Sequence, residues 1–375
     1  MKILTTLSYY RPHISGLTVC VQRLVDGLSK KDFQFTILTS RHRKNLLKSE
    51  TENNVKIIRS PVMLTLGKVP VMPWYFFQAV KEIINNDLVW INLPQAEGLI
   101  AVVIAKIFGK KIITTVHCLP LLPDGWQRSF FQRPFDILNN LIIRLADKVI
   151  YYTKDYAENT KELLHIPSKS SYILPPIILV KSAVNHQPST INHSFSIGFA
   201  GRVAEDKGLE YLLEALSILK SENKDVDLII AGSKNPVGEN SYIKKIDSRL
   251  KDVKFKVDFS GEINPERMFE FYRKIDLLVL PSVNRTEAFG IVQAEAMLSG
   301  VPVVASDLPG VRIPVNLTGG GIVVKPREAL ALSKAIWICL TKKINRIGLA
   351  RTTALIFRPE KILEDYAEVF RQTKN

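Results

Sequence analysis

The sequence has no long hydrophobic run, few cysteines and no cluster of metal ligands. Leu99–Ala105 is interrupted by Lys106, whereas a membrane-spanning helix needs about 18 or more apolar residues. The three cysteines, Cys20, Cys118 and Cys339, are scattered and odd in number, which favours reduced thiols over a disulfide framework. There is no CxxC pair and no histidine cluster of the kind that binds a metal. We therefore expect a cytoplasmic protein with no metal site and no cofactor.

Three further signals are missing. The chain starts directly with a strand-like segment, Lys2–Leu7, and shows no cleavable signal sequence. The turn after this segment lacks the G-x-G-x-x-G pattern of dinucleotide-binding domains. Nothing in the chain resembles a nucleic-acid-binding module, so nucleic acid is not an expected partner.

The charge is basic and unevenly distributed. The formal net charge is +15, from 51 basic and 36 acidic residues. Residues 1–193 hold 24 basic and 13 acidic residues, a net charge of +11, and the rest hold 27 and 23, a net charge of +4. A basic half favours an anionic partner such as a bilayer surface or a lipid phosphate. A simple contribution to solubility is the alternative.

Length and hydrophobic pattern predict two α/β domains. At 375 residues the chain is too long for one domain of typical size. Apolar strand-like segments alternate with amphipathic helical segments, which is typical of parallel sheets. We expect a first domain at 1–185, a linker at 186–194, a second domain at 195–355 and a terminal helical segment at 356–375.

The stretch 285–308 combines a strand end, a loop and a helix start. Leu277–Leu280 leads into a loop with Glu287, and the helix-forming segment Ile291–Ser299 carries Glu295. The N–H groups at such a helix start favour an anion; those expected to bind it belong to Phe289, Gly290 and Ile291. Carboxylates beside an anion site suit hydroxyls better than phosphate, so the pattern predicts a phosphorylated, hydroxyl-rich ligand. Glutamates that are merely solvated or interact with the helix dipole are the alternative.

This stretch resembles the donor site of a known enzyme family. The segment E-A-F-G-I-V-Q-A-E-A-M from Glu287, followed by G-V-P-V-V-A-S, is similar to the signature of retaining GT-B glycosyltransferases of family 4. The resemblance implies that Glu287 faces the donor sugar and that Glu295 holds the ribose. It also implies two doubly wound Rossmann-like domains facing a central cleft. The N-terminal domain would bind the acceptor, and the last helix, in 356–375, would cross back to it.

Four other residues fit the same family. In G-R-V-A-E-D-K-G, Arg202 and Lys207 lie in a strand-to-helix loop, where two cations five residues apart can straddle a diphosphate; the resemblance makes them its ligands. His117 follows a strand, and similar enzymes use a histidine there to orient the donor sugar, although Cys118 replaces their usual aspartate. Of the family's Gly-Gly pair near the donor phosphates only Gly16 is present.

Two aromatic segments are candidates for contact with a bilayer. Val69–Phe77 contains Trp, Tyr and two Phe, and buried helix packing is an equal alternative. Trp126–Phe135 alternates aromatic and cationic residues without acids, which is more typical of a membrane surface. A helix is predicted to follow it, from Phe135 to Ala146.

Pattern and resemblance together predict an enzyme, a glycosyltransferase of the hexosyltransferase type. It would move a sugar from a nucleoside-diphosphate sugar to a glycan, lipid-linked or other hydroxyl acceptor, in cell-envelope polysaccharide or glycolipid synthesis. Its place would be cytoplasmic, in peripheral contact with the inner face of an anionic membrane. Two alternatives stay open: a nucleotide-sugar epimerase or hydrolase on the same fold, and a non-catalytic protein that binds membranes or polyanions.

Overall fold

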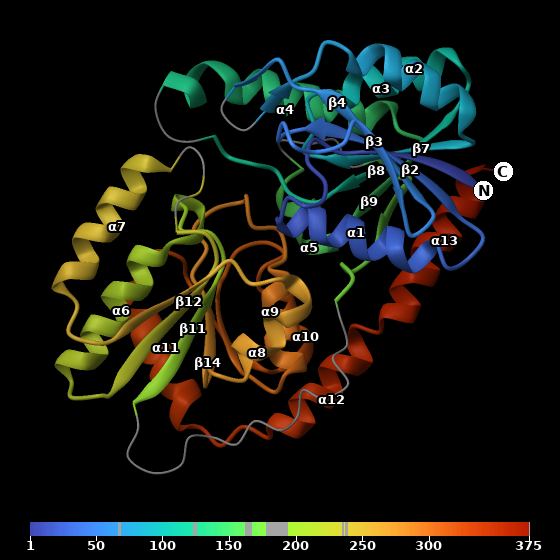
Figure 1. Ribbon diagram of the computed structural model, residues 1–375. Helices are drawn as coiled ribbons and strands as arrows, with labels where there is room; N and C mark the ends of the chain where they lie inside the picture. Colours follow the sequence, from blue (N-terminus) through green and yellow to red (C-terminus); the bar gives the residue numbers. More distant parts are fainter. Residues whose placement is uncertain are drawn as a thin grey trace. The chain divides into compact units, whose positions relative to one another are not determined.

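The computed structural model divides into two compact units (Figure 1). Unit 1 contains Met1–Pro176 and Pro359–Asn375, and unit 2 contains Ile177–Arg358. The structure describes residues 1–66, 69–122, 126–161, 167–177, 194–234, 236 and 239–374, without the side chains of residues 66, 126, 127 and 129. The predicted linker, 186–194, lies outside the described residues except for its last residue, so the expected domain bounds stay a prediction.

Unit 1 is built on one large sheet with the strand order β10-β9-β8-β7-β1-β2-β4-β3. β3 pairs with β4 in antiparallel register, and the other neighbours are parallel. The strands are β1 (Lys2–Thr6), β2 (Gln34–Arg41), β3 (Ser49–Glu52), β4 (Val55–Pro61), β7 (Leu88–Leu93), β8 (Lys111–Val116), β9 (Lys148–Tyr151) and β10 (Ser170–Tyr172), beside a small hairpin of β5 (Leu64–Leu66) and β6 (Val69–Val71). The chain extends the sheet from β1 in one direction and then, from β7, in the other.

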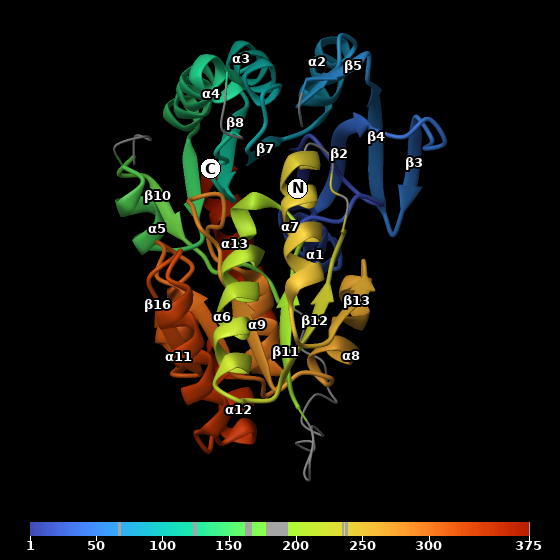
Figure 2. The ribbon, with the colours of Figure 1, turned by 90° about the vertical axis from the view of Figure 1, so that its left-hand side faces the viewer.

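Helices cover both faces of this sheet. α2 (Tyr75–Asn85), α3 (Gly98–Ile107) and α4 (Trp126–Leu145) lie on one face, as Figures 1 and 2 show. α1 (Gly16–Leu28) and α13 (Pro359–Lys374) lie on the other and contact each other, and α5 (Lys154–Asn159) contacts β9. The last helix of the chain is therefore part of unit 1.

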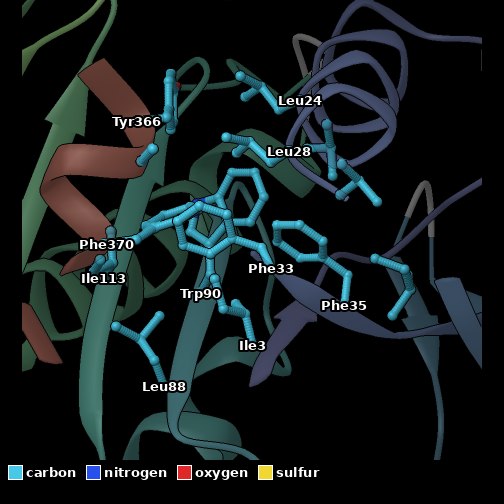
Figure 3. Close-up of a cluster of buried hydrophobic side chains, with 14 of the residues drawn as sticks. Ile3, Leu24, Leu28, Phe33, Phe35, Leu88, Trp90, Ile113, Tyr366 and Phe370 are labelled. Carbon is cyan, nitrogen blue, oxygen red and sulfur yellow. The ribbon is translucent and has the colours of Figure 1, made fainter. Parts of the chain in front are cut away.

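The core between the sheet, α1 and α13 is centred on Trp90 of β7 (Figure 3). Its ring lies 5.2 Å from that of Phe370, 6.0 Å from Tyr366 and 6.3 Å from Phe35, measured between centroids. The indole Nε1 donates a hydrogen bond of 2.9 Å to Oγ1 of Thr115, which satisfies its one polar atom. Because α13 supplies two of these rings, the C-terminal segment completes the core of unit 1.

Unit 2 has a parallel sheet with the strand order β13-β12-β11-β14-β15-β16. The strands are β11 (Phe195–Ala200), β12 (Val226–Ala231), β13 (Val257–Gly261), β14 (Leu277–Leu280), β15 (Val303–Ser306) and β16 (Gly321–Val324). One core joins the sheet to α6 (Leu209–Ser221), α7 (Asn240–Asp252) and α11 (Ala329–Thr341). A second core joins its other face to α8 (Met268–Tyr272), α9 (Ile291–Leu298), α10 (Ile313–Thr318) and α12 (Arg346–Ile356).

The two parallel sheets confirm the predicted α/β class with two Rossmann-like domains. One local prediction is wrong: the helix expected from Phe135 begins at Trp126 and contains Pro134. A proline removes one helical hydrogen bond, but packing against α3 and β8 compensates for that loss. Among the described residues, no helix is both long and apolar enough to cross a membrane.

Candidate functional site

In unit 2, the loops that follow β11 and β14 meet at the point where the sheet changes direction. The two strands are parallel neighbours, and the chain builds outward from them to opposite edges. Ligands of open α/β sheets bind beyond the carboxyl ends of the strands at such a point. The N–H of Val283 donates to the carbonyl of Asp206 at 3.0 Å, which ties the loops together. Gly208 has a φ of 64°, and a Cβ there would lie 2.2 Å from the Pro281 carbonyl oxygen, so this approach requires glycine.

These loops bring Lys207 and Glu287 together. Nζ of Lys207 lies 2.5 Å from Oε2 of Glu287 and 3.7 Å from Oδ2 of Asp206. Burial alone would lower the pKa of Lys207, but the carboxylates of Glu287 and Asp206 outweigh it and raise the pKa above its usual value. Arg202 extends from the same loop, with its NH2 3.7 Å from Oδ1 of Asp206, and remains 37% exposed. The site therefore holds two cations, Arg202 and Lys207, and two carboxylates, Asp206 and Glu287, at the end of the sheet.

The predicted anion site is the first turn of α9. Gly290 precedes the helix with a φ of 75°, and a Cβ there would lie 2.4 Å from Cδ2 of Leu280. Phe289 is buried, and its carbonyl accepts a hydrogen bond of 2.8 Å from Nε2 of Gln293. These contacts hold the first turn. The N–H of Gln293 donates to the carbonyl of Gly290 at 2.9 Å, whereas those of Ile291 and Val292 come before the first carbonyl of the helix that could accept from them. A helix that starts four residues after Glu287, the partner of Lys207, suits an anion.

Glu295 lies one turn further along α9, beside α8. The hydroxyl of Tyr272 donates to Oε2 of Glu295 at 3.0 Å. A hollow at this place is lined by Pro265, Met268, Phe269, Tyr272, Glu295, Leu298 and Ser299. The sequence analysis missed Tyr272; its only signal was the aromatic run Phe269–Tyr272 before a buried strand. The carboxylate is thus oriented by a neighbour and flanked by apolar side chains.

In unit 1, Gly16 begins α1 in the turn after β1. Ser15 stands at the N-cap, where its Oγ accepts a hydrogen bond of 3.2 Å from the N–H of Thr18, the usual role of serine at a helix start. A Cβ at Gly16 would have no atom within 4 Å. Gly16 follows β1, and His117 follows β8. Because β7 lies between these two strands in the sheet, the sheet does not place the two residues side by side.

His117 follows β8 and is buried in a polar network. Its Nε2 lies 2.8 Å from Oδ1 of Asn92, and its Nδ1 is hydrogen-bonded to the hydroxyl of Tyr152. Nδ2 of Asn92 donates to the carbonyl of Thr6 at 3.3 Å, so Oδ1 is the acceptor and the proton of His117 is on Nε2. Burial lowers the pKa of His117 to about 3, so the ring is neutral. Both ring nitrogens are therefore engaged within unit 1.

The sequence analysis also missed Glu97, a buried carboxyl group between β7 and α3. It is 8% exposed, and no hydrogen bond of ordinary geometry reaches its carboxylate oxygens from the described residues. Burial raises the pKa of Glu97 to about 7, against a smaller opposing effect of the nearby Ser8 and backbone N–H groups. The buried hydroxyl of Tyr75 lies within its electrostatic reach. The signal in the sequence was a glutamate four residues after a mostly apolar strand, Leu88–Leu93.

Metal ligands do not gather in the part of the chain that the structure describes. No group of three or more His, Cys, Asp or Glu side chains there is arranged to hold a metal ion.

Two family models match consecutive parts of the chain. The model described as Glycosyltransferase Family 4 matches residues 14–179, and the model described as Glycosyl transferases group 1 matches residues 183–349. Among similar proteins, the uncharacterized glycosyltransferase MJ1607 of Methanocaldococcus jannaschii is 25% identical over 356 residues, which cover 88% of this chain and 86% of that protein.

Solved structures with a similar fold span almost the whole chain. Sucrose-phosphate synthase from Thermosynechococcus elongatus superposes with a TM-score of 0.79 at 19% identity, covering 99% of this chain and 98% of its own. HepE from Anabaena, solved in complex with UDP-glucose, superposes with a TM-score of 0.78 at 20% identity, covering 99% of this chain and 100% of its own. At these identities the likeness establishes the fold, and the family models establish the kinship.

Proposed function

The chain belongs to the group 1, family 4 glycosyltransferases and has their GT-B fold, and we propose that it is a retaining enzyme acting on a nucleoside-diphosphate sugar. The observation that carries this proposal is the meeting of Lys207 and Glu287 at the ends of β11 and β14, next to the first turn of α9. A diphosphate needs cations and N–H donors, and a sugar needs a carboxylate. This end of the sheet offers all three.

Arg202, Lys207 and the N–H groups of Phe289, Gly290 and Ile291 would bind the diphosphate. Lys207 is charged and held in place by the carboxylates of Glu287 and Asp206. On binding, the diphosphate would replace one of these carboxylates as the partner of Lys207. Fixed cations and helix N–H groups favour the charge that builds on a departing diphosphate. With the leaving phosphate as acceptor of the proton from the attacking hydroxyl, the chain needs no separate general base.

The two glutamates would bind the two ends of the donor. Glu287, released from Lys207, would position the sugar. Glu295 would accept hydrogen bonds from the ribose hydroxyls, with Tyr272 fixing the orientation of the carboxylate. The apolar side chains of Phe269 and Leu298 in the adjoining hollow would contact the faces of the nucleoside. UDP-glucose is the first donor to test, because HepE was solved with it.

For unit 1, we propose that Gly16 and His117 each bind part of the substrates. Gly16 would leave room for donor phosphate and acceptor at the start of α1. His117 would orient the donor sugar, and a sugar hydroxyl would have to displace Asn92 or Tyr152 from its ring. A neutral histidine can donate from one nitrogen and accept at the other, which suits a hydroxyl.

The acceptor would be a glycan or a lipid-linked hydroxyl compound of cell-envelope polysaccharide or glycolipid synthesis. The reaction would take place at the cytoplasmic face of a membrane with peripheral contact. The net charge of +11 on residues 1–193 supports an anionic surface as neighbour.

Thermal unfolding with added nucleotides tests the donor site. UDP, GDP, ADP and their sugar conjugates should be compared on the wild type and on Glu295→Ala. A ligand that binds only the native state raises the free energy of unfolding, by about 2.7 kcal/mol when its concentration is a hundred times its Kd. The melting temperature rises as a result. We expect one nucleotide class to stabilise the wild type and to lose this effect in Glu295→Ala. Absence of a shift with every nucleotide would contradict the proposal.

Product analysis then separates transfer from other chemistry on the same fold. With the stabilising donor and a mixture of glycan and lipid-linked acceptors, we expect a glycoside with the anomeric configuration of the donor. Steady release of free sugar with no acceptor product would indicate a hydrolase, and an isomerised donor would indicate an epimerase.

A further inference from the structure

The outer side of α2, α3 and α4 is an unusual surface of unit 1. α2 contacts α3 and α3 contacts α4, and both Figure 1 and Figure 2 show the three side by side on one face of the sheet. The inner sides of these helices are buried by small and aliphatic residues: Ala79, Ile83, Ala101, Ala105, Ile142 and Ile143. Burying these inner sides satisfies the ordinary amphipathic requirement of a surface helix.

Each helix nevertheless carries a second apolar stripe on its outer side. On α3, Ile100, Val103 and Ile107 follow the three-and-four spacing of one helix face and are all exposed, Ile107 to 73%. Exposed apolar residues recur with helical spacing on the other two helices, at Trp74, Phe77 and Ile84 for α2 and at Phe130, Ile137 and Leu141 for α4. We call these nine residues the outer face. A helix that is apolar on both sides needs a second apolar environment.

The charges around the outer face have one sign. Among the described side chains of α2, α3 and α4, the exposed charged ones are Lys81, Lys106, Arg133 and Arg144. The two acids of the same set are withdrawn from this surface. Glu82 is buried and lies 3.0 Å from Lys56, and Asp136 is half-buried and accepts a hydrogen bond from Gln132.

We propose that the outer face docks the protein on an anionic lipid bilayer, with its apolar side chains among the acyl chain ends and its cations on the lipid phosphates. Trp and Phe on one side and Lys and Arg around them are the composition of helices that lie in a membrane interface. A second copy of this chain is the poorer occupant, because a two-fold contact would bring the exposed cations of the three helices against one another, and of these Lys106 already has a partner, Asp147 at 3.1 Å. This inference rests on the proposed function in one respect, which is that the bilayer would hold the acceptor.

Two segments of this surface were already candidates for contact with a bilayer on the sequence alone. The segment Trp126–Phe135 contributes Phe130 and Arg133, and the segment Val69–Phe77 contributes Trp74 and Phe77. The second stripe of α3 joins the two segments into one face, and nothing in the sequence showed that it would be exposed.

Vesicle sedimentation at low salt tests the proposal. The probes are vesicles of phosphatidylglycerol with phosphatidylcholine, and of phosphatidylcholine alone. The test variant is Ile107→Glu with Phe130→Glu; both side chains are more than 70% exposed, at 73% and 72%, so the fold tolerates the change. The matched control is Leu355→Glu, at an apolar residue of α12 in unit 2 that is 64% exposed.

We expect the wild type and Leu355→Glu to bind anionic vesicles with similar affinity and the double variant to bind at least about tenfold more weakly. Equal partitioning of the wild type to neutral and anionic vesicles would overturn the proposal, as would equal weakening by Leu355→Glu. A dimer of the wild type that the double variant dissolves, without vesicle binding, would assign the face to self-association instead.

Donor binding separates this proposal from the proposed function. The melting-temperature shift with UDP-glucose should be the same in the wild type and the double variant, because the outer face is remote in sequence from Lys207 and Glu295. Vesicle binding without any nucleotide-induced shift in melting temperature would support the docking surface and contradict the proposed enzyme. A nucleotide-induced shift without vesicle binding would support the enzyme and contradict the docking surface.

Discussion

The central parallel strands of unit 1 and unit 2 follow the same order, but the two units place different chemistry at the ends of these strands. In unit 2, Lys207 and Glu287 form a charged, partly exposed pair. In unit 1, His117 and Glu97 are deeply buried, and burial shifts both towards their neutral forms. Charged groups suit a diphosphate, whereas neutral donors and acceptors suit hydroxyls. We therefore expect the sheet topology to determine where a ligand binds and the side chains to determine which part of the ligand binds there.

The largest expected effect concerns the buried titratable groups of unit 1. It is the loss of protein stability in acid that the neutral side chain of His117 should cause. The pKa of His117 is about 3 in the folded protein and 6.5 in the unfolded chain, so between these values the unfolded chain binds the extra proton. Stability should fall as the pH falls from 6.5 towards 3, by about 5 kcal/mol in total at about 1.4 kcal/mol for each pKa unit.

His117→Gln isolates this effect, because glutamine can also donate to Asn92 and accept from Tyr152 but does not titrate. Urea unfolding of both proteins across this pH range should show a difference that changes with pH. Parallel stability curves for the two proteins would contradict the assigned burial of His117.

The charged character of unit 2 is tested by Lys207→Ala. If Lys207 stabilises charge on the leaving diphosphate, as proposed, its removal should lower kcat by about 10² to 10³-fold. Lys220→Ala is the control, because Lys220 forms an exposed ion pair with Asp225 at 2.6 Å at the end of α6; it should change kcat less than about twofold. Steady-state kinetics with the identified donor measure both, and equal kcat values for the two variants would refute the role of Lys207.

Glu97 should produce a pH dependence opposite to that of His117. Its pKa is about 7 in the folded protein and 4.5 in the unfolded chain, so the folded protein keeps a proton that the unfolded chain has lost. Stability should decrease as the pH rises from 4.5 to about 7, by about 3 kcal/mol. Glu97→Gln should abolish this decrease in urea unfolding, whereas Glu360→Gln, at an exposed glutamate of α13, should preserve it. A decrease that persists in Glu97→Gln would assign it to another group.

Tyr272→Phe should have the smallest effect. It removes the hydroxyl that donates to Glu295 at 3.0 Å and keeps the ring. A hydrogen bond to a charged group contributes about 1.5–3 kcal/mol, and the ribose would keep its own contacts, so we expect KM for the donor to rise about tenfold with kcat nearly unchanged. Tyr172→Phe, at an exposed tyrosine of β10, is the control. A fall in kcat without a change in KM would place Tyr272 outside the nucleoside site.

The sequence allowed the α/β class and most helices and strands to be predicted, because both depend on local periodicity. The helix starting at Ile291 and the strand Leu277–Leu280 agree with the structure. The start of α4 does not, because Pro134 is a local stop signal that packing of the helix overrides. The five-residue helix α8, with Tyr272, is too short to leave a periodic pattern.

Some features of the candidate site depend on contacts between distant segments. The pairing of Lys207 with Glu287 joins residues 80 positions apart. The burial of Glu97 depends on β1 and α2, which precede it, and a single glutamate after a strand gives no measure of its exposure. The engagement of both His117 nitrogens depends on Asn92 and Tyr152, which come from two other strand ends.

Spacing and periodicity are properties of neighbouring residues, so they were enough to predict the two α/β domains, the kinship with family 4 and the positions of the motif residues Arg202, Lys207, Glu287 and Glu295. Which charges pair, which titratable groups are buried away from water and which apolar stripes stay exposed could be seen only in the packed structure. Burial depends on the neighbours that folding brings from elsewhere in the chain. For that reason the second stripe of α3 and the shifted pKa of Glu97 emerge only once the helices and strands are packed.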